Sequence, residues 1–188
     1  VVGLICATEN MPSGGAIKPG DVVTAMNGKT IEILNTDAEG RVVLADGLSY
    51  AVEKVKPDMI VDLATLTGAC MVALGEDIAG LFSNNEILGE TLKDAAKASG
   101  EHVWELPLAS EYKELLKSTV ADIKNISGKR YGGAINGALF LQEFVPDTIP
   151  WAHLDIAGPA FAEKDAPLTP PCGTGFGVAM LLEYLRQI

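Results

Sequence analysis

Two kinds of apolar pattern alternate along this chain. Mostly apolar runs of six to eight residues predict buried strands, and segments in which apolar residues recur at intervals of three or four predict helices. The predicted strands are residues 1–7, 59–66, 78–83, 103–108 and 151–156. The predicted helices are residues 41–55, 86–99, 110–116, 134–144 and 177–186, with a short one after Thr67-Gly68. Strands that alternate with helices indicate an α/β fold, a mixed and mostly parallel sheet with helices on both faces.

Several turn residues mark where these elements end. Asn27-Gly28 separates two short extended runs and predicts a β-hairpin, because both residues tolerate a positive φ. Pro57 ends the helix that begins near residue 41, and Gly100 ends the helix that begins at residue 86. In folds of this class, ligands bind beyond the carboxyl ends of the strands, where we therefore expect the functional residues.

Residues 1–7 have the pattern of a strand that no cap or turn precedes. Residues 1–7 are apolar throughout and have no cap or turn before them, which is typical of a buried parallel strand. We therefore expect residues 1–188 to form one domain that is a fragment of a longer chain.

Composition and charge exclude several classes of partner. The chain has 14 basic and 25 acidic residues, a net charge of −11, and its basic residues are scattered singly, so this portion is not expected to bind nucleic acid. No apolar run reaches the roughly 18 residues that a membrane span requires. Cys6, Cys70 and Cys172 are far apart among apolar or small neighbours, which predicts reduced, buried thiols in a cytoplasmic protein.

An acidic turn precedes the first predicted helix. Asp37 and Glu39 are two residues apart, so their side chains diverge in a helix and can converge only on a non-helical backbone. With Gly40 and Arg41 they form a candidate metal and anion site at the start of a helix. The alternative is a capping box formed by Thr36 and Glu39, and spacing alone favours that alternative.

The same turn resembles the signature of a known family. Asn35-Thr36-Asp37-Ala38-Glu39-Gly40-Arg41 is similar, over seven consecutive residues, to the signature of the leucyl (cytosol) aminopeptidases. Further segments resemble the family in the family's order, and they are Glu9 to Pro12, Pro19 to Asp21, Ala64 to Ala69 and Trp151 to Gly158. The resemblance therefore extends over nearly the whole chain, and it implies that residues 1–188 are the C-terminal portion of the family's catalytic domain, without its upstream part.

The resemblance implies a function and a set of site residues. It implies a peptidase that releases amino-terminal residues, preferably leucine, with water activated by two divalent cations, zinc or manganese. Asp37 and Glu39 become metal ligands, with Glu39 bridging both ions, and Arg41 holds a bicarbonate that helps move the proton. The residues implied to bind substrate are Asn35, Ala38, Thr65, Leu66, Gly68 and Ala157. The family also assembles as homohexamers.

The resemblance implies further ligands that this chain lacks. The family's site includes two Lys and two Asp residues upstream of the segment that begins here, and Lys18 and Asp21 belong to a different family loop. Two carboxylates offer about four oxygen donors to two ions that need more. We therefore expect weak metal binding and no catalytic competence from the isolated chain.

Other functions are less consistent with the sequence. Residues 15–29 resemble part of a PDZ peptide-binding domain, but the strands and helices after Asp37 have no place in one. A serine or cysteine hydrolase is disfavoured because the chain has no Gly-x-Ser-x-Gly elbow and only two histidines, His102 and His153. The glycines at 132 and 133 are weak support for a phosphate loop. A non-catalytic scaffold of the family fold is the remaining alternative.

Overall fold

The fold is taken from a computed structural model that describes residues 1–165 and 170–187. The chain divides into two compact units, each made of two separate stretches of sequence. Unit 1 consists of Val1–Asp58 and Ala109–Ile149, and unit 2 consists of Met59–Leu108 and Pro150–Ile188.

Unit 2 is built on a mixed four-stranded sheet. In spatial order its strands are β3 (Ile60–Ala64), β7 (Trp151–Asp155), β4 (Ile78–Ser83) and β5 (His102–Glu105). The pairs β3–β7 and β4–β5 are parallel, and β4–β7 is antiparallel. Each of these strands falls on a run for which the apolar pattern predicts a strand, and the mixed α/β class is confirmed.

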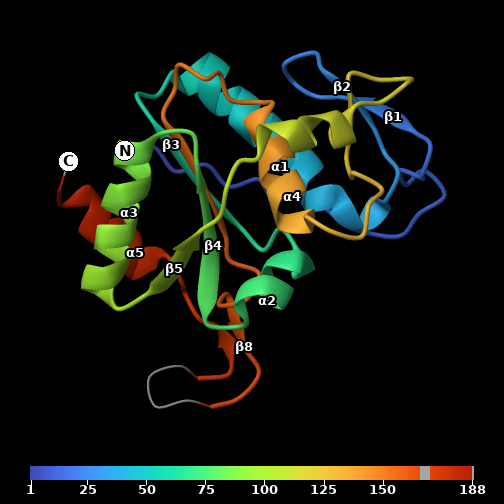
Figure 1. The fold of residues 1–188 in the computed structure, drawn as a ribbon. Coiled ribbons are helices and arrows are strands. Elements are labelled where there is room, and N and C mark those ends of the chain that lie inside the picture. Colours follow the sequence, from blue (N-terminus) through green and yellow to red (C-terminus); the bar gives the residue numbers. More distant parts are fainter. Residues whose placement is uncertain (166–169, 188) are drawn as a thin grey trace. The chain divides into compact units, whose positions relative to one another are not determined.

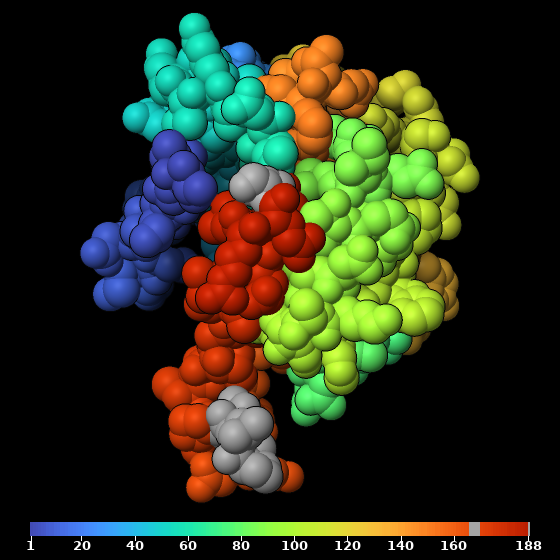
Figure 2. All heavy atoms as spheres, turned by 90° about the vertical axis from the view of Figure 1, so that its left-hand side faces the viewer, coloured from blue at the N-terminus to red at the C-terminus, as the bar shows by residue number. Residues whose placement is uncertain are grey.

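Helices cover both faces of this sheet, as the fold class predicts. Helices α3 (Glu86–Ser99) and α5 (Val178–Leu185) pack against each other and against one face, where Leu81 and Leu154 are fully buried (Figures 1 and 2). The other face meets α2 (Gly68–Leu74), because a Cβ added at Gly80 would lie 2.8 Å from the Sγ of Cys70. Because Gly80 has no side chain, α2 can lie close to β4.

Helix α3 begins and ends where local signals predict. The side chain of Asn85 accepts a hydrogen bond from the backbone N–H of Leu88 and caps the first turn. Gly100 follows the last turn with a φ of +80°, the left-handed conformation that suits glycine. The bounds predicted from the sequence, residues 86–99, are confirmed.

Unit 1 combines a small sheet with two principal helices. Its sheet contains β1 (Val22–Thr24), β2 (Thr30–Glu32) and β6 (Ile123–Lys124), and its helices are η1 (Thr36–Ala38), α1 (Glu39–Tyr50), η2 (Ala51–Val55), η3 (Ser110–Leu116) and α4 (Gly133–Gln142). β1 and β2 form the antiparallel hairpin predicted from Asn27-Gly28, and Gly28 has a φ of +88°. The parallel strand β6 was not predicted, because a two-residue strand has no measurable period.

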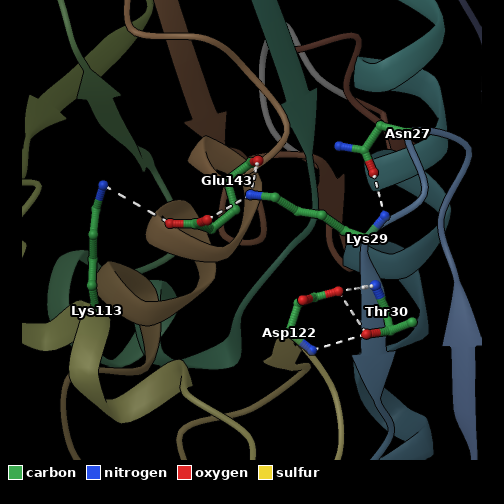
Figure 3. A network of polar contacts seen from close by, with 6 residues as sticks. All are labelled: Asn27, Lys29, Thr30, Lys113, Asp122 and Glu143. Carbon is green, nitrogen blue, oxygen red and sulfur yellow. Dashed lines mark hydrogen bonds and ion pairs between the residues drawn. The ribbon is translucent and has the colours of Figure 1, made fainter.

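Polar contacts fasten the hairpin to the rest of unit 1. The ammonium group of Lys29 lies 2.7 Å from both the backbone oxygen and the carboxylate of Glu143, just after α4 (Figure 3). Asp122 accepts hydrogen bonds from the hydroxyl and the backbone N–H of Thr30, and these bonds lower the pKa of the Asp122 carboxyl. The hairpin is thus held at the start of β2.

Three sequence predictions about burial and strands were wrong. Residues 1–7 are exposed and form no strand, because an apolar run becomes a strand only where a neighbouring strand supplies its backbone partners. Cys6 lies in this segment and is exposed, and Cys172 is exposed in β9 (Cys172–Gly173), so only Cys70 is a buried thiol. β9 pairs with β8 (Phe161–Ala162), a short ribbon that the sequence pattern also missed.

Among the described residues, no helix is long and apolar enough to span a membrane.

Candidate active site

The acidic turn lies in unit 1 between β2 and α1. Asn35 caps η1, because its side-chain oxygen accepts a 2.9 Å hydrogen bond from the backbone N–H of Asp37. The predicted capping box is therefore wrong in its capping residue, since the side chain of Asn35 and not that of Thr36 accepts the capping hydrogen bond. The cap fixes the backbone that carries Asp37.

The backbone between the two carboxylates leaves helical geometry. Asp37 lies in η1, Glu39 is the first residue of α1, and Ala38 between them has φ −104° and ψ +40°. Both carboxylates are exposed. This is the non-helical backbone that the spacing of Asp37 and Glu39 requires for their side chains to act together.

Arg41 is held from two sides. Its side chain is buried, with 7% of the residue exposed, and its Nη1 donates a 2.8 Å hydrogen bond to the backbone oxygen of Asn125. The guanidinium carbon lies 6.0 Å from the centre of the Phe140 ring, within the range of a cation–π interaction. These contacts fix the direction of the guanidinium group.

Asn125 organises the turn, and the sequence did not indicate it. It is fully buried, its Oδ1 accepts a 2.9 Å hydrogen bond from the N–H of Leu34, and its Nδ2 donates a 2.6 Å bond to the oxygen of Asn35. Longer contacts of 3.4 and 3.5 Å reach the N–H of Asn35 and the oxygen of Ala38. One side chain thus braces the backbone on both sides of η1.

The donor set fits a divalent cation in chemistry but is incomplete in number. Carboxylate oxygens are hard donors that suit manganese and are accepted by zinc. In the described part of the chain, no group of three or more His, Cys, Asp or Glu side chains is placed to hold a metal ion. Asp37 and Glu39 alone would therefore be only part of a coordination shell. Asp21 is engaged in its own loop, where it accepts a hydrogen bond from the N–H of Lys18.

Four further candidates lie in unit 2, at the ends of two adjacent parallel strands. Thr65, Leu66 and Gly68 follow β3, and Ala157 follows β7. Thr65 and Gly68 are exposed, and Leu66 and Ala157 are half-buried. The structure brings these four residues to one edge of one sheet, and it brings Asn35, Asp37, Ala38, Glu39 and Arg41 together within unit 1.

The buried carboxylate of Asp155, which the sequence did not indicate, contacts both the segment after β3 and the segment after β7. Asp155, the last residue of β7, is fully buried, and it accepts hydrogen bonds from the backbone N–H groups of Leu66, Thr67 and Ala157. The only sequence signal is an acidic residue at the end of a strongly apolar strand, where an unpaired charge would be costly.

The two histidines occupy the positions predicted for non-catalytic residues. His153 is fully buried, and its Nδ1 lies 2.6 Å from a carboxylate oxygen of Asp62, which also accepts a hydrogen bond from the indole of Trp151. His102 is exposed on β5. Both observations agree with a packed position for His153 and a surface position for His102.

Comparisons with known proteins point to one family. A family model described as "cytosol aminopeptidase family, catalytic domain" matches residues 1–182. A probable cytosol aminopeptidase of Chlorobaculum tepidum is 58% identical over 186 residues, which cover 99% of this chain and 36% of the relative. A probable cytosol aminopeptidase of Aquifex aeolicus is 58% identical over 189 residues, which cover 100% of this chain and 38% of the relative.

Solved structures agree with the sequence comparisons. A tomato leucine aminopeptidase mutant has a TM-score of 0.91 and 49% identity, and the match covers 97% of this chain and 35% of that protein. The bottromycin maturation enzyme BotP in complex with Mn has a TM-score of 0.89 and 46% identity over 95% of this chain and 40% of BotP.

The extent of these matches defines what is shared. The chain spans 36 to 38% of the length of the two curated relatives. The residues that resemble a PDZ domain lie inside the matched region, so the hairpin is part of the same domain as the acidic turn. The chain belongs to the cytosol aminopeptidase family and represents part of its catalytic domain.

Proposed function

We propose that the protein is a metal-dependent aminopeptidase that releases amino-terminal residues, preferably leucine, from peptides. The observation that carries this proposal is the turn from Asn35 to Arg41, in which two exposed carboxylates follow a capped, non-helical backbone beside a fixed guanidinium group. Family membership supports the same reaction class, since the relatives are named as aminopeptidases.

Asp37 and Glu39 are proposed to be ligands that would hold two divalent cations. Manganese is supported by the BotP complex, whose description names Mn, and zinc is compatible with the same donors. When bound, such cations lower the pKa of water and stabilise the oxyanion of a tetrahedral intermediate. The contribution of this chain is to hold two carboxylates on a backbone that Asn35 and Asn125 fix in place.

Arg41 is proposed to hold a bicarbonate, which when bound would supply a proton acceptor at the site. A planar guanidinium group can donate two parallel hydrogen bonds to such an anion, which a lysine ammonium group cannot do. The contact of Nη1 with Asn125 and the nearby Phe140 ring orient the group. Arg41→Lys is therefore expected to lower kcat strongly although it keeps the charge.

The remaining site residues are proposed to bind the peptide substrate. Asn35 and Ala38 lie on the acidic turn, and Thr65, Leu66, Gly68 and Ala157 lie on the two segments of unit 2. The protein is further proposed to work in the cytoplasm, as the names of its relatives indicate, and to assemble as a homohexamer.

Hydrolysis of leucyl p-nitroanilide with added Mn²⁺ tests the proposal. We expect activity from the protein as its gene encodes it and none from residues 1–188 alone, because two carboxylates supply too few ligands for two ions. Robust turnover by residues 1–188 alone would refute the proposed need for further ligands. No turnover by the complete gene product would refute the aminopeptidase proposal and favour a non-catalytic scaffold.

A ligand variant and a matched control sharpen this test. Asp37→Ala removes an exposed carboxylate and should abolish turnover while leaving the unfolding transition unchanged, because the residue is exposed to solvent. Asp58→Ala removes another exposed carboxylate of unit 1 and should leave turnover unchanged. Retained activity in Asp37→Ala would refute its role as a ligand.

A further inference from the structure

Asp155 accepts hydrogen bonds from two separate segments of unit 2. One oxygen, Oδ1, lies 3.1 Å from the N–H nitrogen of Leu66, 3.3 Å from that of Thr67 and 3.2 Å from that of Ala157. The other oxygen, Oδ2, accepts a 2.6 Å hydrogen bond from the hydroxyl of Thr67. Three backbone N–H groups and one hydroxyl thus donate hydrogen bonds to the carboxylate, so both of its oxygens have partners.

The sheet explains why one carboxylate reaches both segments. β3 and β7 are parallel and in register, with Ala64 opposite Asp155. The next ladder bond runs from the N–H of Ile156 to the oxygen of Ala64 at 2.9 Å. Both strands therefore end at the same level, and the backbone nitrogens of Leu66 and Ala157 lie within hydrogen-bond distance of the same oxygen atom.

The contacts of Asp155 continue into the start of α2. The hydroxyl of Thr67 donates to Asp155 and accepts a 3.1 Å hydrogen bond from the N–H of Cys70, so it links the carboxylate to the first turn of the helix. Burial, together with the charge of Asp155, raises the pKa of the Cys70 thiol to about 11, which keeps this neighbour neutral. The charge on Asp155 is thus surrounded by neutral donors.

We propose that Asp155 is a positioning residue for substrate binding, which fixes the separation between the Leu66 and Ala157 segments so that both contact the amino-terminal side chain of the peptide. The inference rests on the proposed function. Asp155 itself is buried and does not touch the substrate. Loss of its charge weakens the hydrogen bonds to both segments at once, so the segments move apart and a large side chain loses contact on both sides.

Steady-state kinetics of the complete gene product test this role. In Asp155→Asn, we expect KM for leucyl p-nitroanilide to rise about tenfold while KM for glycyl p-nitroanilide and both kcat values change less than about threefold. Thr67→Val, which removes only the hydroxyl, should shift KM in the same direction, and Thr67→Ser should restore it. Thr67→Val keeps the test valid if Asp155→Asn fails to fold.

The carboxylate of Glu101 supplies the matched control. Glu101 also holds backbone in unit 2, accepting hydrogen bonds from the N–H groups of Gly177 and Met180 at 2.7 and 2.8 Å. Glu101→Gln should lower stability without changing the preference for leucyl over glycyl substrate. Asp155→Asn and Thr67→Val variants that lose stability but keep this preference would overturn the positioning role, which would then be structural only.

Hydrogen exchange separates failure of this inference from failure of the proposed function. Asp155→Asn should speed amide exchange in residues 65–68 and 156–158 together, whereas Glu101→Gln should not. Exchange that changes in one segment alone would show that Asp155 does not couple them. A wild-type protein that cleaves neither anilide would refute the proposed function and with it the role in substrate binding, even if the exchange result holds.

Discussion

Replacing Asn125 with Ala removes the side chain that braces the acidic turn but keeps the backbone oxygen that holds Arg41. The lost contacts are two short hydrogen bonds, at 2.9 Å to the N–H of Leu34 and 2.6 Å to the oxygen of Asn35, and two long ones at 3.4 and 3.5 Å. At about 1 kcal/mol for each short bond, and little for the long ones, the turn should lose about 2 kcal/mol of local stability.

Amide hydrogen exchange measures this loss at the donors themselves. A loss of about 2 kcal/mol corresponds to about 30-fold faster exchange at the amides of Leu34 and Asn35. Asn27→Ala is the matched control, because its side chain accepts only one hydrogen bond, from the N–H of Lys29, in the exposed hairpin. Exchange at Leu34 and Asn35 that stays within about twofold of wild type in Asn125→Ala would refute the bracing role.

Three further predictions concern unit 2. The raised pKa of Cys70, about 11 against an ordinary 9.0, means that above pH 9 the unfolded thiol ionises and the folded one does not, so stability falls by about 1.4 kcal/mol per pH unit up to pH 11. Denaturant unfolding at pH 9 to 11 should show this slope and Cys70→Ser should remove it, and equal slopes would contradict the assignment. Gly158→Ala should destabilise by about 2 to 3 kcal/mol, because its Cβ would lie 2.4 Å from the oxygen of Gly75, and an unchanged melting temperature would disprove that clash. Asp62→Ala leaves the buried nitrogens of Trp151 and His153 without their acceptor and should cost about 3 kcal/mol, with altered Trp fluorescence, whereas wild-type stability would show that water replaces the carboxylate.

Local chemistry made several elements predictable from the sequence. Gly100 marks the end of α3 because a left-handed glycine acts within one helical turn. Asn27-Gly28 predicted the β1–β2 hairpin for the same reason, since the turn depends on adjacent residues. The apolar runs of β4 and β7 placed them in the core without information from elsewhere in the chain.

Short elements and exposed segments were less predictable. β6 and β9 have two residues each, too few for a period of two to be recognised. Residues 1–7 have a strand-like composition but are exposed, because pairing depends on a neighbour that composition does not specify. The capping of η1 by Asn35 and not by Thr36 depends on the backbone conformation of the turn, which the spacing of Thr36 and Glu39 does not specify.

The sequence by itself determined which residues could carry the chemistry, namely Asp37, Glu39 and Arg41 in one seven-residue segment. Tertiary structure decided what holds these residues in place, and what holds the proposed substrate-binding residues of unit 2. Asn125 is 84 residues from Arg41, and Asp155 is 89 residues from Leu66. A cap or a turn is set by interactions within a few residues, whereas these buried acceptors find their donors only after β6 has joined β2 and β7 has joined β3.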